Sequence, residues 1–262
     1  MLPRRPKLRC PGLFVTGTDT GVGKTVVTCA IAWQLRHCGE KTDPGAGGVG
    51  VCYPIATGCR RDREGLVSED AEALAHFADC REPLDLINPV RYKHALAPAV
   101  AAAACGRAVD GAAILRSLEQ LDGRSSLMLI EGVGGLLVPL GDQNASCSVL
   151  ELIQAVGFPV LVVCRAGLGT LNHTAMTVRI LQEAGCRVAG LVVNGYVADA
   201  AKADPSMATN RQWLATMNRT QVLATVPACL AQTISPQKGK LPAAVLEAVG
   251  VSDWPRILLP SR

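Results

Sequence analysis

The chain has 262 residues, of which 49% are hydrophobic and only 3% aromatic, and its formal net charge at pH 7 is +4. This length suits one domain with a sizeable core of Val, Leu, Ile and Ala. Basic and aromatic residues are not interleaved, which argues against a nucleic-acid surface, and no apolar run approaches the roughly 20 residues of a membrane span.

The first 12 residues are basic and contain three prolines, with no apolar segment behind them. They are therefore expected to form a disordered extension and not a signal peptide. We expect the folded domain over residues 13–234 and an appended C-terminal tail over 235–262.

Apolar segments typical of strands alternate with helical patterns along the chain. The expected strands cover 13–16, 49–55, 127–130, 159–164, 188–193 and 222–226. The expected helices cover 24–38, 69–78, 111–121, 172–184 and 206–217. Because strands separated by helices are joined by right-handed crossovers, this order predicts a single-domain α/β fold. The fold would be a doubly wound, mostly parallel sheet with helices on both faces. Residues 42–50, which carry four glycines and a proline, are expected to form a loop.

A glycine-rich turn, residues 17–25, joins the first strand to the first helix. Gly21 and Gly23 let backbone N–H groups turn toward phosphate oxygens, and the helix N-terminus adds its positive dipole end. In such a loop Lys24 reaches the β- and γ-phosphates and the Thr25 hydroxyl binds magnesium. Thr18 replaces the first glycine of the strict pattern, but strand, loop, Gly-Lys-Thr and helix follow in the right order. The turn predicts an ATP-binding fold of the P-loop NTPase type; a turn that binds nothing is the alternative.

Two acidic residues could complete a magnesium site beside Thr25. Glu131 ends a strand, and the carboxyl end of a central strand lies beside the first loop in a doubly wound sheet. Asp70 lies in SEDAEAL at a helix start, where an acid by itself is more typical of a cap. A hard cation prefers several oxygen ligands, so both carboxylates are candidates.

In order along the chain, the motifs resemble those of the dethiobiotin synthetase family, ATP-dependent cyclo-ligases of biotin biosynthesis. VTGTDTGVGKT (15–25) resembles the family's phosphate loop, and IEGVGGLLVPL (130–140) resembles its E-G-A-G-G signature. The weaker matches are PIATG (54–58), SEDAEAL (68–74), NPVRYKHALAPAVAA (88–102), GLGTLNH (167–173) and GLVVN (190–194). The resemblance runs from about residue 13 to 228.

The resemblance implies a ligase that uses ATP as co-substrate and Mg²⁺ as cofactor. CO2 would add to one amine of 7,8-diaminononanoate, and ATP would phosphorylate the carbamate. The second amine would then close the ureido ring and release phosphate. The resemblance also implies a homodimer with the substrate at the subunit interface, and small molecules as partners with neither nucleic acid nor membrane.

The resemblance also implies roles for individual residues. Lys24 would be catalytic, with Tyr53 at the position of a second family lysine, and Thr25, Asp70 and Glu131 would bind magnesium. The implied nucleotide-binding set is Gly21, Val22, Gly23, Lys24, Thr25, Asp70, Glu131, Gly132, Val133, Gly134, Asn194, Gly195 and Pro227. The implied substrate-binding set is Thr57, Gly169, Thr170, Leu171 and Asn172. From the residues alone, Asn172 is an N-cap candidate for a helix whose free N–H groups could bind the substrate carboxylate.

Three departures from the family pattern leave alternatives open. The family has a lysine before the proline of P-[IV]-A-[ST]-G, whereas Tyr53 precedes Pro54 here, and residues 42–50 resemble an insertion. Ala99 stands where the family commonly has a histidine. The alternatives to an active ligase are a P-loop homologue weakened in catalysis and a related amidoligase or partition-type ATPase. Asp19 argues against the last, because partition-type loops carry a lysine there. Lys41 could replace the missing lysine if the loop folds back.

The 11 cysteines are odd in number and form no C-x-x-C motif. Many, such as Cys29, Cys164 and Cys186, lie in apolar runs, where cysteine behaves as a small hydrophobic residue. Reduced thiols, and therefore a cytoplasmic location, are expected.

Overall fold

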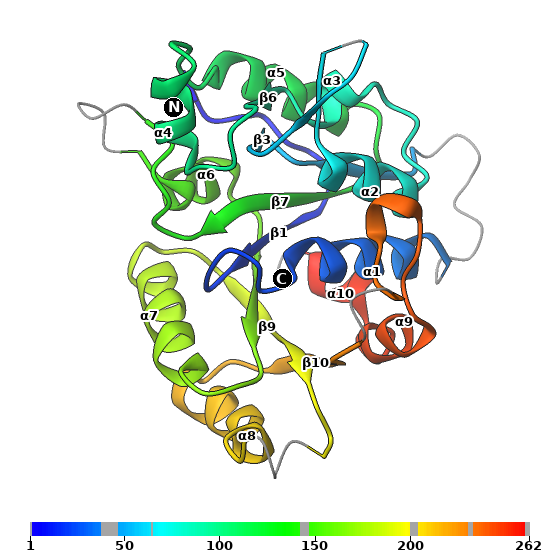
Figure 1. Ribbon diagram of the computed structural model, residues 1–262, viewed down its shortest axis with the longest axis vertical. Coiled ribbons are helices and arrows are strands. Elements are labelled where there is room, and N and C mark those ends of the chain that lie inside the picture. The colour runs from blue at the N-terminus through cyan, green and yellow to red at the C-terminus, as the bar shows by residue number, and fades with distance from the viewer. Residues whose placement is uncertain are drawn as a thin grey trace.

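The computed structural model describes residues 2–37, 47–63, 65–141, 147–199, 204–229 and 233–259. Its centre is a six-stranded sheet in the order β10–β9–β8–β1–β7–β2, in which every pairing is parallel (Figure 1). The strands are β1 (Gly12–Gly17), β2 (Val49–Cys52), β7 (Leu127–Gly135), β8 (Val160–Arg165), β9 (Val188–Tyr196) and β10 (Val222–Pro227). The predicted doubly wound α/β fold is confirmed.

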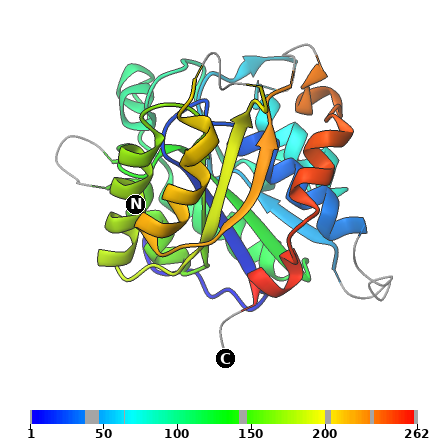
Figure 2. The same ribbon diagram turned by 90° about the horizontal axis from the view of Figure 1, so that it is seen from below.

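Helices cover both faces of this sheet, as the view in Figure 2 shows. On one face lie α1 (Lys24–His37), α2 (Glu69–Ala78), α9 (Ala243–Val249) and α10 (Trp254–Leu258). On the other lie α4 (Pro98–Ala104), α5 (Gly111–Asp122), α6 (Val149–Val156), α7 (Thr170–Glu183) and α8 (Met207–Asn218).

Strand residues alternate between the two faces. In β1, Leu13 and Val15 pack with the first helical layer, whereas Phe14 packs with the second. Each of the three is fully buried. Successive side chains of a strand point to opposite faces, so near-continuous apolar strands supply both cores at once.

Several short elements complete this framework. They are β3 (Ile55–Ala56) with β6 (Val90–Arg91), antiparallel β4 (Arg60–Arg61) with β5 (Leu66–Val67), α3 (Leu84–Ile87) and the 3-10 turn η3 (Pro236–Lys238). The strand predicted over 49–55 is therefore divided: β2 ends at Cys52. Pro54 has no N–H to donate to a ladder, and the Tyr53 N–H donates to the Ile87 carbonyl instead (2.8 Å).

The bounds predicted for the helix over 69–78 agree with α2. Ser68 caps its start by accepting a hydrogen bond from the Ala71 N–H (3.3 Å), and Asp79 ends it in a left-handed conformation with φ of 50°. The first is a local start signal and the second a local stop signal. They place Asp70 in the first turn, at the carboxyl edge of the sheet.

The N-terminal segment, expected to be a disordered extension, packs on the domain in the structure. Arg4 forms an ion pair with Glu119 of α5 at 2.6 Å. The backbone N–H groups of Arg9 and Cys10 donate to one carboxylate oxygen of Asp122 (2.8 and 2.9 Å). Most of the loop over 42–50 lies outside the described residues, although Gly47 and Gly48 accept hydrogen bonds from the Ser126 N–H.

The C-terminal segment also differs from the expected tail. Val245 and Val249 of α9 are fully buried against the α1 layer, and Trp254 of α10 is 1% exposed. The Trp254 indole donates to the Val249 carbonyl at 2.8 Å. Helices of this length show too little periodicity to be recognised from sequence, and they are stabilised here by tertiary packing. Among the described residues, no helix combines the length and apolar character needed to cross a bilayer.

Candidate active site

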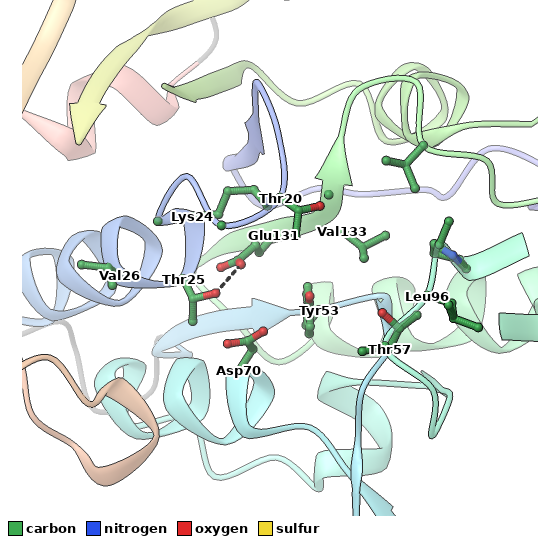
Figure 3. A pocket seen from close by; sticks show the side chains of 17 residues that line it. Thr20, Lys24, Thr25, Val26, Tyr53, Thr57, Asp70, Leu96, Glu131 and Val133 are labelled. Atoms are coloured by element: carbon green, nitrogen blue, oxygen red, sulfur yellow. Dashed lines mark hydrogen bonds between the residues drawn. The ribbon is translucent and has the colours of Figure 1, made fainter. Parts of the chain in front are cut away.

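A cavity of about 560 Å³ opens at the carboxyl ends of β1 and β7 (Figure 3). The phosphate loop and the start of α1 form one wall, and Glu131, Val133 and Gly134 near the end of β7 form the next. Tyr53, Thr57 and Asp70 line the opposite side. The segment 95–98 and Val138 close it with apolar side chains.

The phosphate loop has the backbone shape predicted from its glycines. Gly21 and Gly23 have φ values of 69° and 96°, in the left-handed region that favours glycine. A Cβ atom on Gly23 would lie 2.0 Å from the Asn194 side-chain nitrogen. That nitrogen donates to the Val22 carbonyl at 2.9 Å, so β9 holds the loop from the side opposite the cavity.

Lys24 is a buried cation on the cavity wall, 7% exposed. Its Nζ donates to the Asp19 carbonyl at 3.1 Å. Burial lowers the pKa of this ammonium, while nearby Glu131, Asp70 and Asp19 act in the opposite direction. Among the described residues that line the cavity, Lys24 is the single Lys or Arg, so the cavity contains one protein cation facing two carboxylates.

Glu131 and Asp70 meet at Thr25. The Thr25 hydroxyl donates to Glu131 Oε1 at 2.7 Å, and Asp70 lies on the other side of that hydroxyl (Figure 3). Glu131 is 1% exposed, and its Oε2 has no hydrogen-bond partner in the structure. Burial, and secondly the charge of Asp70, raise the pKa of Glu131 from 4.5 to about 7. Asp70 is exposed toward the cavity, but partial desolvation by the surrounding protein raises the pKa of its carboxyl.

This arrangement fits a magnesium ion. No group of three His, Cys, Asp or Glu side chains in the described part of the chain could hold a metal by itself. Mg²⁺, however, usually takes one or two carboxylates and completes its coordination with water and substrate phosphates. Thr25, Asp70 and Glu131 offer such a set, and the unpartnered Oε2 is a buried acceptor that a cation would satisfy.

Glu131→Gln is expected to stabilise the protein at pH 8 in the absence of added magnesium. The folded-state pKa lies above the ordinary value of 4.5. The stabilisation from protonated Glu131 is therefore complete below about pH 4.5 and is lost as the pH rises through about 7. Glutamine cannot ionise and keeps an acceptor for Thr25, so the free energy of unfolding at pH 8 should increase by about 1–3 kcal/mol. Urea unfolding at pH 4.5 and 8 measures this.

The same substitution should weaken magnesium-dependent ATP binding, and Asp70→Asn should do so with a smaller change in stability because Asp70 is exposed. If Glu131→Gln leaves the magnesium titration unchanged, Glu131 is not a ligand. If Glu131→Gln and the parent have equal free energies of unfolding at both pH values, burial does not destabilise the ionised Glu131 carboxylate.

Tyr53 occupies the position that the sequence comparison left in question. It is 7% exposed, lines the cavity and lies between the acidic pair and Thr57 (Figure 3). Burial first, then Glu131 and Asp70, raise the pKa of its phenol well above 10, so it is neutral at physiological pH. The side chain therefore supplies a hydrogen-bonding group and no charge. Lys41, the other candidate cation, lies outside the described residues.

Three residues of the predicted nucleotide-binding set are not among those that line the cavity. Asn194 and Gly195 lie just before the end of β9 at Tyr196, and Pro227 ends the neighbouring β10. Because β9 and β7 lie on opposite sides of β1, these residues flank the phosphate loop on the side away from Glu131. Val22 and Gly132 are buried beneath the site, so their contact with a nucleotide would be through the backbone.

The predicted substrate residues are divided between two places. Thr57 lines the cavity, whereas residues 169–172 lie outside it, at the start of α7. The prediction that Asn172 is the N-cap is wrong: the cap is Gly169, with a φ of 89°, and α7 begins at Thr170. The left-handed glycine lets the helix begin earlier, and Asn172 is left exposed in the first turn. Leu171 is half-buried, and the buried Thr170 hydroxyl lies 3.4 Å from that of Thr174.

Sequence reasoning did not predict several lining residues. Thr20, the segment 95–98 and Val138 all contribute to the cavity. The signal for the second of these was present in NPVRYKHALAPAVAA, which we noted as a motif without assigning it a role. Val138 approaches because its loop is joined to α4 by a hydrogen bond from the Ala99 N–H to the Pro139 carbonyl (3.1 Å).

Comparison with known proteins agrees with this geometry. A family model described as an AAA domain matches residues 11–233. The chain is 41% identical over 219 residues to the ATP-dependent dethiobiotin synthetase BioD of Anaeromyxobacter sp. (strain K), covering 82% of this chain and 89% of that protein. It is 39% identical to the BioD of Thermodesulfovibrio yellowstonii, covering 78% and 82%.

Among solved structures, the septum site-determining protein MinD of Pyrococcus horikoshii, complexed with Mg-ADP, has a similar fold. The TM-score is 0.54 at 15% identity, and the match covers 93% of this chain and 94% of that one. This likeness concerns the fold alone.

Proposed function

Because this chain belongs to the family of ATP-dependent dethiobiotin synthetases, we propose that its cavity carboxylates and cyclises 7,8-diaminononanoate with CO2, ATP and magnesium. The product is dethiobiotin, and the enzyme is an ATP-dependent cyclo-ligase. The observation that supports this most directly is the meeting of Thr25, Asp70 and Glu131 beside Lys24 in one cavity.

Phosphoryl transfer depends on positioning and charge neutralisation more than on covalent chemistry. Lys24 reaches the β- and γ-phosphates, and the N–H groups of Gly21 to Thr25 hold the phosphate oxygens. Bound magnesium would neutralise phosphate charge from its place at Thr25, Asp70 and Glu131. The backbone at Glu131, Gly132, Val133 and Gly134 borders the same phosphates, while Asn194, Gly195 and Pro227 contact adenine.

The carbamate forms when a substrate amine attacks CO2 and loses a proton. A carbamate oxygen then attacks the γ-phosphorus, and ADP leaves. The second amine attacks the carbamate carbon, the ureido ring closes, and phosphate leaves with that oxygen. Thr57 and Tyr53 offer hydroxyl groups near the reacting amines, and Leu96, Val133 and Val138 form an apolar wall suited to the aliphatic chain.

The carboxylate of the substrate would bind at the N-terminus of α7, to the backbone of residues 169–172. Because this segment lies outside the cavity, we propose that a second copy of the chain contributes it and that the enzyme is a homodimer. A cytoplasmic location fits the ten described cysteines, all of which are free thiols.

The methyl ester of 7,8-diaminononanoate should bind more weakly than the acid, by about 10–100-fold. This range corresponds to the roughly 1.5–3 kcal/mol of a hydrogen bond to a charged group. Competition calorimetry with the ATP-bound protein measures both affinities. The control is 2,3-diaminononane, which lacks the carboxylate and should bind no more tightly than the ester. Equal binding of acid and ester would remove residues 169–172 from the substrate site.

The direct test of the function is ADP release with saturating ATP, magnesium, bicarbonate and 7,8-diaminononanoate, with the product mass measured in parallel. Dethiobiotin formed in step with ADP supports the proposal. ADP release that is independent of the diamine would contradict it and favour a nucleotide-binding homologue that no longer ligates.

A further inference from the structure

The loop that precedes α7 is held by the start of α8, a helix from a distant part of the chain. The Asn210 side chain of α8 is 4% exposed, and its nitrogen lies 2.8 Å from the Ala166 carbonyl and 3.2 Å from the Gly167 carbonyl. The Asp204 carboxylate accepts from the Leu168 N–H at 2.9 Å. Three consecutive residues of the loop are thus bonded through their backbone.

The side chains of Asp204 and Asn210 are themselves held in place by Ser206. Ser206 donates from its N–H and its Oγ to the second oxygen of Asp204, at 3.0 and 2.5 Å. Its Oγ also lies 3.2 Å from the Asn210 nitrogen. Because Ser206 is bonded to both Asp204 and Asn210, the three side chains hold one another in place. Such a network fixes the loop more firmly than isolated bonds would.

The start of the loop is also anchored by Ala166, which is 2% exposed and donates its N–H to the Asn194 carbonyl at 3.0 Å. Leu168 is 88% exposed and therefore does not anchor it. A Cβ atom at Gly167 would lie 2.7 Å from the nearer Asp204 oxygen, so this carboxylate approaches as far as only glycine allows. Beyond Ala166, the loop is therefore held by its hydrogen bonds with Asp204 and Asn210.

We infer that Asp204 and Asn210 are positioning residues for the acid substrate. They act through the backbone of residues 166–168, which sets the direction in which the N–H groups of residues 169–172 point. The inference rests on the proposed function, which places the substrate carboxylate at these groups. Neither residue is among those that line the cavity.

The test compares the acid and its methyl ester in Asn210→Ala and Asp204→Ala. Asn218→Ala is the matched control, because Asn218 is also a buried asparagine of α8 but donates to Leu214 of its own helix (2.8 Å) at the far end. In Asn210→Ala and Asp204→Ala, the KM for the acid should rise about tenfold, the scale of one hydrogen bond to a charged group. The KM for the ester and for ATP should stay at the parent values, so the preference for the acid is lost.

Asp204→Asn keeps a carbonyl acceptor for Leu168 and should lie between the parent and Asp204→Ala. If Asn210→Ala does not fold, the test uses Asp204→Ala and Asp204→Asn, because Asp204 is only half-buried. The inference is overturned if Asn210→Ala and Asp204→Ala both retain the parent's preference for the acid, or if Asn218→Ala loses this preference equally. A parent that binds acid and ester alike would instead overturn the substrate site itself, and the inference with it.

Discussion

Lys24→Ala is expected to lower ATP-dependent turnover by about 10²–10³-fold, the usual effect of removing a group aimed at developing charge. The described residues that line the cavity include no second Lys or Arg, so none of them can replace this ammonium. Its loss also leaves Glu131 and Asp70 without the cation that partly offsets their raised pKa values. ATP binding should weaken strongly, because a desolvated phosphate charge loses its partner.

Calorimetry with Mg-ATP and the diamine-dependent rate of ADP release measure the two effects. Lys24→Met retains much of the apolar stem and should fail in the same way, which separates loss of charge from loss of packing. Lys93→Ala, an exposed lysine near the segment 95–98, is the control and should behave as the parent. A Lys24→Ala protein that binds ATP as tightly as the parent would contradict the assignment of the phosphate loop.

Tyr53→Lys is expected to raise turnover by roughly tenfold or more, a conservative share of the effect of one charged donor. The carbamate carries a negative charge beside the triphosphate, and both Lys24 and magnesium would be engaged with phosphates. The phenol of Tyr53 is neutral because burial and the two nearby acids raise its pKa well above 10. A lysine in this position would meet Glu131 and Asp70, which favour its charged form despite burial.

The rate of ADP release with saturating diaminononanoate and bicarbonate measures the effect of Tyr53→Lys on turnover. Tyr53→Phe keeps the ring and removes the hydroxyl, so it should change the rate far less than Tyr53→Lys; a large loss in Tyr53→Phe would instead assign the hydroxyl a direct role. A parent as fast as the Tyr53→Lys protein would show that another group supplies the charge. Lys41→Ala would then identify that group.

Local signals in the sequence were sufficient for the central framework. β1, the phosphate loop and α1 follow from an apolar strand, two glycines in left-handed conformations and Lys24 in order. The bounds of α2 follow from its Ser68 cap, which in turn places Asp70. Such signals act within a few residues of the chain, and therefore they can be recognised without the rest of the fold. The placing of Glu131 beside Thr25 needed only the strand order of a doubly wound sheet.

Tertiary structure alone decided the features that depend on contacts between distant segments. β2 ends at Cys52 because Tyr53 bonds to Ile87 instead of a strand. Helix α7 is capped by Gly169, and not by Asn172 as the sequence predicted. Helices α9 and α10 exist because the α1 layer buries them, and the loop before α7 is shaped by α8. The unpartnered Oε2 of Glu131 likewise results from burial by many segments together. Burial and long-range hydrogen bonds are set by the whole fold, so no short stretch of sequence contains them.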